Sequence, residues 1–430
     1  MRSWRTAAWR LGPLSLAWAF ASVAGAQTIT DPTKPPSPTP PVVTPATPAN
    51  PTPQKAPSPF SFTYDYSVDL LDNVSGGLRP GQAYVALLKG AASYDGSAVG
   101  HDGLTGLVSL IYANGVDFTA NRVGALQAVS SLEAQPGAFR LYEAWLAQDI
   151  LGGKGGVKAG LIDLNTTFDV QETAALFINS SSGIGPEFGD TGLNGPSNYP
   201  LPSLAVTAFY RPADDWTAQV GLFDGVAGDP NHRANFFAIS LSARDGALIV
   251  AQLEKRFGEV ARIEGGVWAY TSSFPALSQV DAAGQPRQLG GNAGFYGLVE
   301  GRLFAKPGGG GDGGLSGWLR AGGANGQINR ITSYVGAGLV YTGLFRGRPS
   351  DAAGVAISRA GLGVGISEAS ALQGRPVGGA ETNIEATYRF GVKSWLTLQP
   401  DVQYVIDPGG DRRLGDALVV GLRIAITGTR

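Results

Sequence analysis

From residue 60 onward, polar and apolar residues alternate in short segments that Gly, Asp, Asn and Pro separate. In residues 381–390, ETNIEATYRF, the odd-numbered positions are all polar and the even-numbered ones are mostly apolar. Residues 395–404 and 416–426 repeat this alternation. A period of two places successive side chains on opposite faces of an extended chain, whereas an amphipathic helix has a period of about 3.6. The pattern therefore predicts an all-β protein.

The two faces of these segments differ in a way that suits a membrane barrel. One face carries both Glu and Arg, as expected where it lines water, and the other carries large apolar residues, as expected against lipid. About 16 or 17 such segments can be counted, one of them at 234–243, and roughly 22 residues are available per strand, which suits tilted strands of about 10 residues. We expect a transmembrane antiparallel β-barrel with about 16 strands, in preference to 18.

Aromatic residues near the segment ends are typical of the interfacial girdles of such a barrel, although some aromatics merely flank turns. The candidates are Trp216, Trp268, Phe304, Trp318, Tyr341, Phe390, Trp395 and Tyr404.

The N-terminus has the three parts of an export signal. Arg2, Arg5 and Arg10 are basic, residues 11–20 are mostly apolar, and Ala24-Gly25-Ala26 is a small-residue cleavage site. The apolar run is too short for a membrane-spanning helix, which needs about 20 residues. We predict that residues 1–26 are a cleaved signal peptide. Because no later stretch is apolar enough for a membrane helix, a membrane-inserted form must be a closed barrel.

Residues 27–59 are dominated by Pro and Thr. Proline lacks the N–H group that helices and sheets require. We predict a disordered, Pro-rich N-terminal arm, extended at roughly 3.1 Å per residue, that acts as a linker. A contact between this arm and the cell wall is the second interpretation. Residues 60–430 then form the barrel domain.

Composition excludes several classes of function. The chain has no Cys and two His, so iron–sulfur clusters, thiol chemistry and multi-histidine metal sites are not expected, and we predict no metal or cofactor. Without residues 1–26 the chain has 29 basic and 34 acidic residues, a net charge of −5, which indicates no nucleic-acid partner. A barrel hydrolase is the enzymatic alternative, but His101 and His232 lie in Gly- or Pro-flanked turns without a serine motif. We expect no enzyme.

Two long stretches, 115–138 and 165–202, do not have the strand pattern. Long loops of a barrel form extracellular caps or fold into the lumen. The second stretch is rich in Asn and Ser and has a helical turn at 170–177. We expect it to fold inward and constrict a pore, and the Gly-rich run at 308–314 to be an external loop or turn.

Several segments resemble the carbohydrate-selective porins of the OprB type. They are YEAWLAQDILGGKGGVKAGLIDLNTTFD, FINSSSGIGP and NYPLP in the first half, and ETNIEATYRFGVKSWLTLQPDVQYVIDPGGDRRLGDALVVGLR near the end. The DNVSGGL run at 72–78 is also similar. The resemblance covers most of residues 60–430 and implies a 16-stranded outer-membrane barrel with inward loops that admits sugars. One departure is the C-terminus, which is Arg430 instead of an aromatic residue.

Sugar hydroxyls require acceptors, donors and an aromatic face, so lumen-facing Asp, Glu, Arg and Tyr are the candidate substrate-binding residues. The alternative is that each is a solvated wall residue or part of a stiffening Arg–carboxylate pair. Strand parity and the resemblance together select Glu143, Asp163, Asn165, Arg262, Glu264, Tyr296, Glu300, Arg302, Glu385, Arg389 and Arg423.

The expected function is passive, substrate-selective diffusion of carbohydrates across the outer membrane into the periplasm. The alternative is a general, weakly selective porin for small hydrophilic solutes. The expected partners are the permeating sugars and outer-membrane lipid, and both a monomer and a trimer are compatible with the sequence. Because the candidate residues carry both signs, we expect a constriction of mixed charge with weak ion selectivity.

Overall fold

The computed structural model describes residues 58–134, 137–229, 235–237, 239, 241–242, 244–306, 313–374 and 377–430. The predicted signal peptide, the predicted linker up to residue 57, His232 and most of the Gly-rich run lie outside these residues. In the described part of the chain, no helix has the length and apolar character needed to cross a bilayer.

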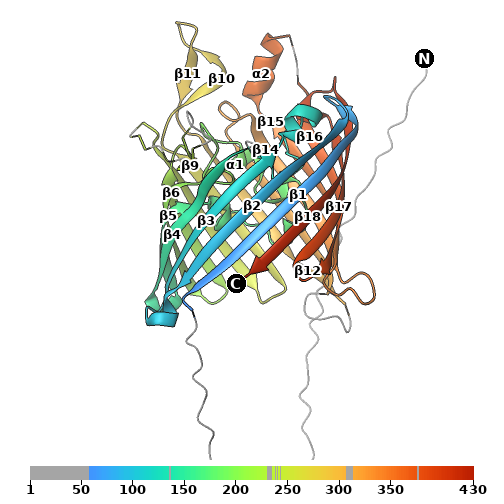
Figure 1. Cartoon of the computed structure of the whole chain (residues 1–430). Helices are drawn as coiled ribbons and strands as arrows, with labels where there is room; N and C mark the ends of the chain where they lie inside the picture. The colour runs from blue at the N-terminus through green and yellow to red at the C-terminus, as the bar shows by residue number, and fades with distance from the viewer. Residues whose placement is uncertain are drawn as a thin grey trace, which may run out of the picture. The chain divides into compact units, whose positions relative to one another are not determined.

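Sixteen antiparallel strands close into one barrel, in which each strand pairs with its neighbours in the chain and β1 pairs with β18 (Figure 1). This confirms the predicted fold and strand number. The barrel strands are β1 (Phe60–Gly77), β2 (Gly81–Asp95), β3 (Leu104–Gly115), β4 (Phe139–Ile150), β5 (Gly155–Ile162), β6 (Ser203–Ala213), β7 (Trp216–Asp224), β8 (Ala247–Phe257), β9 (Ala261–Tyr270), β12 (Ala293–Ala305), β13 (Gly314–Ala324), β14 (Ile331–Thr342), β15 (Ala352–Leu362), β16 (Ala380–Lys393), β17 (Leu396–Ile406) and β18 (Gly415–Thr429).

The remaining elements are short and lie in the connections. A separate hairpin of β10 (Phe274–Val280) and β11 (Pro286–Leu289) stands at one rim beside α2 (Val364–Leu372) (Figure 1). The other helices are η1 (Gly96–Val99), η2 (Thr119–Val123), η3 (Leu151–Gly153), η4 (Leu164–Thr166), η5 (Ala174–Leu176), η6 (Ser180–Ser182), α1 (Pro186–Gly189) and η7 (Pro408–Gly410).

The predicted strand at 234–243 is wrong for the residues that the structure describes there. Residues 235–237, 239 and 241–242 belong to the connection between β7 and β8 and have no strand assignment. The register explains why: β7 pairs directly with β8 from Trp216 opposite Lys255 to Asp224 opposite Ala247, which leaves no place between them in the sheet.

The two rims of the barrel carry different connections. The chain starts β1 and finishes β18 at the same rim, where Thr63 pairs with Thr429. Connections at that rim are short, such as 214–215 and 394–395, whereas the opposite rim carries the long ones. Short turns face the periplasm in outer-membrane barrels. We therefore refer to the rim where β1 begins and β18 ends as the periplasmic rim.

Strand register assigns side chains to the inner or outer face. Glu300 pairs with Arg262 on one neighbouring strand and with Trp318 on the other, so these three side chains share the inner face. The adjacent Val299 is 43% exposed on the outer face. Trp318 and Trp268 are buried inside the barrel, so they do not belong to the predicted aromatic girdle.

Two long connections fold into the lumen, as predicted. We call residues 116–138 the short inward loop and residues 163–202 the long inward loop. The long loop contributes Phe168 and Phe188 to a buried cluster with inward residues of the strands, including Trp268 and Tyr296. The ring of Phe188 stacks on that of Trp268 at 4.9 Å between centroids. The interior of this barrel therefore contains a hydrophobic core, because the inward loops supply apolar side chains that pack against the inner faces of the strands.

Candidate functional site: a polar vestibule beneath the long inward loop

Three adjacent cavities lie inside the barrel toward the periplasmic rim, with volumes of about 470, 320 and 310 Å³. The first and second share Glu172, Arg256 and Arg262 in their linings. The second and third share Leu176 and Arg389. Because they share walls, we treat the three cavities together as one space and call it the vestibule.

The long inward loop forms one side of the vestibule. Thr166, Thr167 and Val170 line the first cavity, and Thr173 and Leu176 line the second. The opposite sides are the inner faces of the strands near their periplasmic ends. The loop therefore separates the vestibule from the filled, extracellular part of the lumen.

Carboxylates of the barrel wall hold the long loop through its backbone. Glu300 accepts hydrogen bonds from the backbone N–H groups of Glu172 (3.0 Å) and Thr173 (2.6 Å). Glu385 accepts them from Ile178 (2.6 Å) and from the next residue (3.3 Å). Hydrogen bonds to a charged acceptor are stronger than neutral ones. Each wall glutamate thus fixes two successive residues of the loop.

A buried ion triad holds the same loop at a third place. Arg320 on β13 forms a forked pair with Asp169, at 2.7 and 2.6 Å, and donates to Glu187 at 2.8 Å. All three side chains are fully buried. Burial raises the pKa of Glu187 above its ordinary value, although the positive charge of Arg320 opposes the shift. The guanidinium also lies over the rings of Tyr296 and Tyr334, at 5.7 and 5.2 Å.

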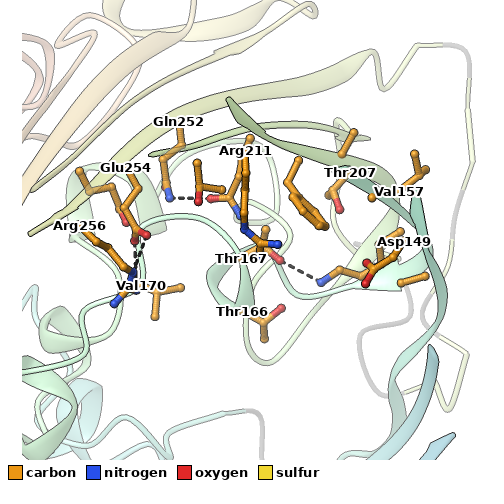
Figure 2. Close-up of a pocket in the computed structure, with 18 of the residues that line it drawn as sticks. Asp149, Val157, Thr166, Thr167, Val170, Thr207, Arg211, Gln252, Glu254 and Arg256 are labelled. Atoms are coloured by element: carbon orange, nitrogen blue, oxygen red, sulfur yellow. Dashed lines mark hydrogen bonds and ion pairs between the residues drawn. The ribbon is translucent and has the colours of Figure 1, made fainter. Parts of the chain in front are cut away.

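The first cavity combines an aromatic ring with donors and acceptors (Figure 2). Phe209 lines it, with the guanidinium of Arg211 4.5 Å from the ring centre. Gln252 donates to Gln219 at 2.9 Å, and Lys158 donates to Thr167 at 3.0 Å. A sugar ring requires an apolar face for its C–H groups and planar polar groups for its hydroxyls, and this cavity offers both.

Arg262 lies between the first and second cavities. Its guanidinium donates to Glu300 (2.7 Å), Glu254 (2.7 Å) and Glu264 (3.2 Å), and also to the carbonyl oxygen of Val170. One arginine therefore connects three strands of the wall to the long loop. This is the stiffening role that the sequence left open as the alternative to substrate binding.

Six of the eleven predicted site residues line the vestibule. Arg262 and Glu264 are in the first cavity, and Arg262 with Glu300, Arg302 and Arg389 in the second. Arg389 and Arg423 line the third.

The other five predicted residues lie outside the vestibule lining. Glu143 is buried 3.8 Å from Lys89, and Asp163 accepts hydrogen bonds from Tyr142 and from the backbone of Asn165.

Three of those five have structural roles beside or within the long loop. The side chain of Asn165 donates to loop carbonyls, including that of Asp169 at 2.9 Å. Tyr296 is buried and donates to Gln252 at 2.5 Å, and Glu385 holds the loop as described above. Parity correctly placed Tyr296 and Glu385 on the inner face, but it could not show that the loop covers them.

Several vestibule residues were not predicted from the sequence. Gln252, Glu254 and Arg256 alternate with Leu253 and Lys255 on β8, so the same parity rule would have selected them. Phe209 had no comparable signal because an inward aromatic residue is indistinguishable from an outward one when the neighbouring positions are Ala, Tyr and Arg.

A closed barrel with a polar internal space bounded by an inward loop defines a porin. A family model described as "Carbohydrate-selective porin, OprB family" matches residues 90–427. The chain therefore belongs to the OprB family of carbohydrate-selective porins. It is an outer-membrane porin, a channel through which sugars diffuse.

Individual relatives agree with this assignment. Porin B of Pseudomonas aeruginosa is 26% identical over 330 residues, which cover 70% of this chain and 71% of that protein. The high-pH structure of Pseudomonas putida OprB has a TM-score of 0.77 at 22% identity and covers 86% of this chain and 94% of its own. The low-pH structure of the same protein has a TM-score of 0.55 at 19% identity, over 86% and 92% of the two chains. These structures share the fold.

Proposed function

We propose that sugars cross the periplasmic half of the barrel through the vestibule, and that the long inward loop makes the channel selective for carbohydrates. The observation that carries this proposal is the first cavity, in which the ring of Phe209 lies among amide, carboxylate and guanidinium groups of β7–β9. Its volume of about 470 Å³ falls within the usual range of small-ligand pockets, roughly 300–1,000 Å³.

The chemistry favours uncharged polyols over other small solutes. A permeating hydroxyl can exchange its water for Gln219, Gln252 or Glu254 without a change of charge. An amino acid of the same size carries two charges and lacks a continuous C–H face for stacking. The general, weakly selective porin would show no such preference.

Liposome swelling tests the proposal with the purified full chain. Sugars should enter faster than amino acids of matched size, and Phe209→Ala should reduce this difference. Phe257→Ala is the matched control, because Phe257 lies on the outer face at the same rim and is 48% exposed. Rates that depend on solute size alone would support the general porin and reject sugar selectivity.

We also propose that residues 1–26 are removed on export and that residues 27–59 are a Pro-rich linker, with a contact to the cell wall as the second interpretation. Support comes from the position of Phe60, which begins β1 at the periplasmic rim. Deletion of residues 31–57 should leave sugar-driven swelling unchanged and abolish co-sedimentation with purified peptidoglycan. Unchanged co-sedimentation would reject the contact.

A further inference from the structure

Two carboxylates of the lumen wall are neutralised by the protein itself. Asp69 forms a forked pair with Arg423, with both bonds at 2.7 Å, and also accepts from Ser130. Glu300 is occupied by Arg262 and by the backbone of the long loop. These two negative charges of the lumen wall are therefore not free to meet a permeating solute.

Two lumen cations have no such partner. Arg302 on β12 and Arg389 on β16 both line the second cavity. Register places Arg302 opposite Ser316 and Arg389 opposite Ala352, which also line this cavity. Among the described residues, neither guanidinium has a hydrogen bond or an ion pair, in contrast to Arg256, Arg262 and Arg423.

The wall between these two arginines is small and uncharged. Ser316, Val340 and Thr342 line it, and the cavity has a volume of about 320 Å³. Of its three carboxylates, Glu172 pairs with Arg256 at 2.7 Å and Glu300 with Arg262, which leaves Glu259 in the turn before β9. The third cavity continues from Arg389 to Arg423 without any carboxylate in its lining. Because Arg423 is paired with Asp69, the unpaired positive charge on this side of the vestibule comes from Arg302 and Arg389.

We propose that Arg302 and Arg389 form a binding site for the anionic group of acidic sugars, either the carboxylate of a sugar acid or the phosphate of a sugar phosphate. A guanidinium offers a planar fork of donors that matches either group. The hydroxyls of Thr173, Ser316 and Thr342 line the same cavity and can bind the sugar hydroxyls. This inference rests on the proposed function, because it assigns a substrate class to the same vestibule.

Like charges in one cavity repel each other, so an empty site of this kind costs free energy that a bound anion recovers. Elsewhere in the wall this repulsion is avoided because a carboxylate lies beside the arginine. The site also changes the expected ion selectivity. The sequence suggested a balance of signs and weak selectivity, whereas the two unpaired arginines of the second cavity favour anions there.

The test uses the purified full chain in planar bilayers with a KCl gradient. Wild-type channels should prefer chloride, and the double variant Arg302→Gln/Arg389→Gln should lower the chloride-to-potassium permeability ratio by about fivefold, because two positive charges are lost from the wall of the second cavity. The matched control is Arg287→Gln/Arg413→Gln, which removes the same charge from exposed positions outside the vestibule. The control should keep the wild-type ratio. A double variant that also keeps it would overturn the proposal.

Liposome swelling and current block identify the ligand. Glucuronate and glucose 6-phosphate are the two probes, and either one should block the potassium chloride current of the wild type more strongly than acetate or glucose does. The probe that blocks better identifies the group as carboxylate or phosphate, and the double variant should lose the block. Equal block by acetate would overturn the site as one for sugars.

The glucose measurements distinguish the proposed sugar selectivity from the proposed acidic-sugar site. If the double variant admits glucose normally but loses the glucuronate block, both the proposed function and the acidic-sugar site are supported. If the wild type fails to distinguish glucose from amino acids but shows the arginine-dependent block, the proposed selectivity fails and the site stands. A wild type that selects glucose without any arginine-dependent block overturns the site alone.

Discussion

The two inward loops enter the same lumen but are held there in different ways. The long loop has its own buried triad around Arg320, two wall glutamates and the stacked ring of Phe188. The short loop has one wall glutamate, Glu381, which accepts from the N–H groups of residues 126 (2.6 Å) and 127 (2.9 Å). It also bonds to Asp69 through Ser130.

The short loop additionally rests on the long one. Ser131 donates its N–H to the carbonyl oxygen of Ile178 at 2.7 Å, and Ser180 donates to that of Ala128 at 2.9 Å. The wall contacts of the long loop at Arg320 and Glu300 do not involve the short loop. We infer that the position of the short loop depends on that of the long loop, and that the long loop determines the shape of the channel.

The largest expected effect comes from removal of residues 177–195. This deletion takes away Phe188, Glu187 and both backbone bonds to the short loop, so single-channel conductance should rise and sugar discrimination should disappear. Recording in planar bilayers measures both. Removal of residues 275–288, which form the hairpin outside the barrel, should change neither. An unchanged conductance after the first deletion would place the constriction at the short loop.

Arg320→Met should destabilise the long loop by about 3–5 kcal/mol, because it leaves Asp169 and Glu187 as buried charges without a cation. Hydrogen exchange of the loop amides is the readout, and the short loop should exchange faster as a secondary effect. The triple variant Asp169→Asn/Glu187→Gln/Arg320→Met should recover most of the protection. Loss of protection in the short loop alone would contradict the proposed dependence.

Two matched substitutions compare the wall glutamates. Glu300→Ala removes the acceptor for residues 172 and 173, and Glu381→Ala removes that for residues 126 and 127. Each hydrogen bond to a charged group contributes about 1.5–3 kcal/mol. Exchange should accelerate in both loops for Glu300→Ala and only in the short loop for Glu381→Ala. The opposite pattern would reverse the dependence between the loops.

The smallest effect concerns pH and is confined to the short loop. Glu133 accepts hydrogen bonds from the N–H (2.9 Å) and hydroxyl (2.6 Å) of Thr119, and burial raises its pKa to about 7. Because the folded protein binds this proton more tightly than the unfolded chain, the contribution is complete at low pH and is lost as the pH rises through about 7.

Exchange of the short-loop amides, corrected for the intrinsic rate, should therefore quicken between pH 5 and 8, and Glu133→Gln should abolish the trend. Asp411 gives an internal comparison at the same rim. Its bonds with Arg413 lower its pKa to about 2, so its turn should show no pH dependence in that window. A trend that persists in Glu133→Gln would assign the titration to another group.

The closed barrel could be predicted from particular residues because strand parity is a local property. Residues 381–390 alternate so regularly that Glu385 and Arg389 could be assigned to the inner face before any partner strand was known. The prediction of Trp318 as a girdle residue rested on its position near a segment end and was wrong. An aromatic residue suits both a lipid interface and a loop-filled lumen, and only the register distinguishes them.

The distinction between free and occupied charges was decided by the tertiary structure alone. Arg302 and Arg320 are both inward arginines of neighbouring strands, yet one faces the open vestibule and the other is enclosed by Asp169 and Glu187. Their local sequences do not differ in a way that reveals this, because both acids come from a loop more than 100 residues away in the chain. By itself, the sequence determined that the chain is a barrel with a charged interior, since alternation depends only on nearest neighbours. Which of those charges a solute can reach depends on where the two inward loops lie in the lumen. These loops have no sequence periodicity, so only the tertiary structure determines their position.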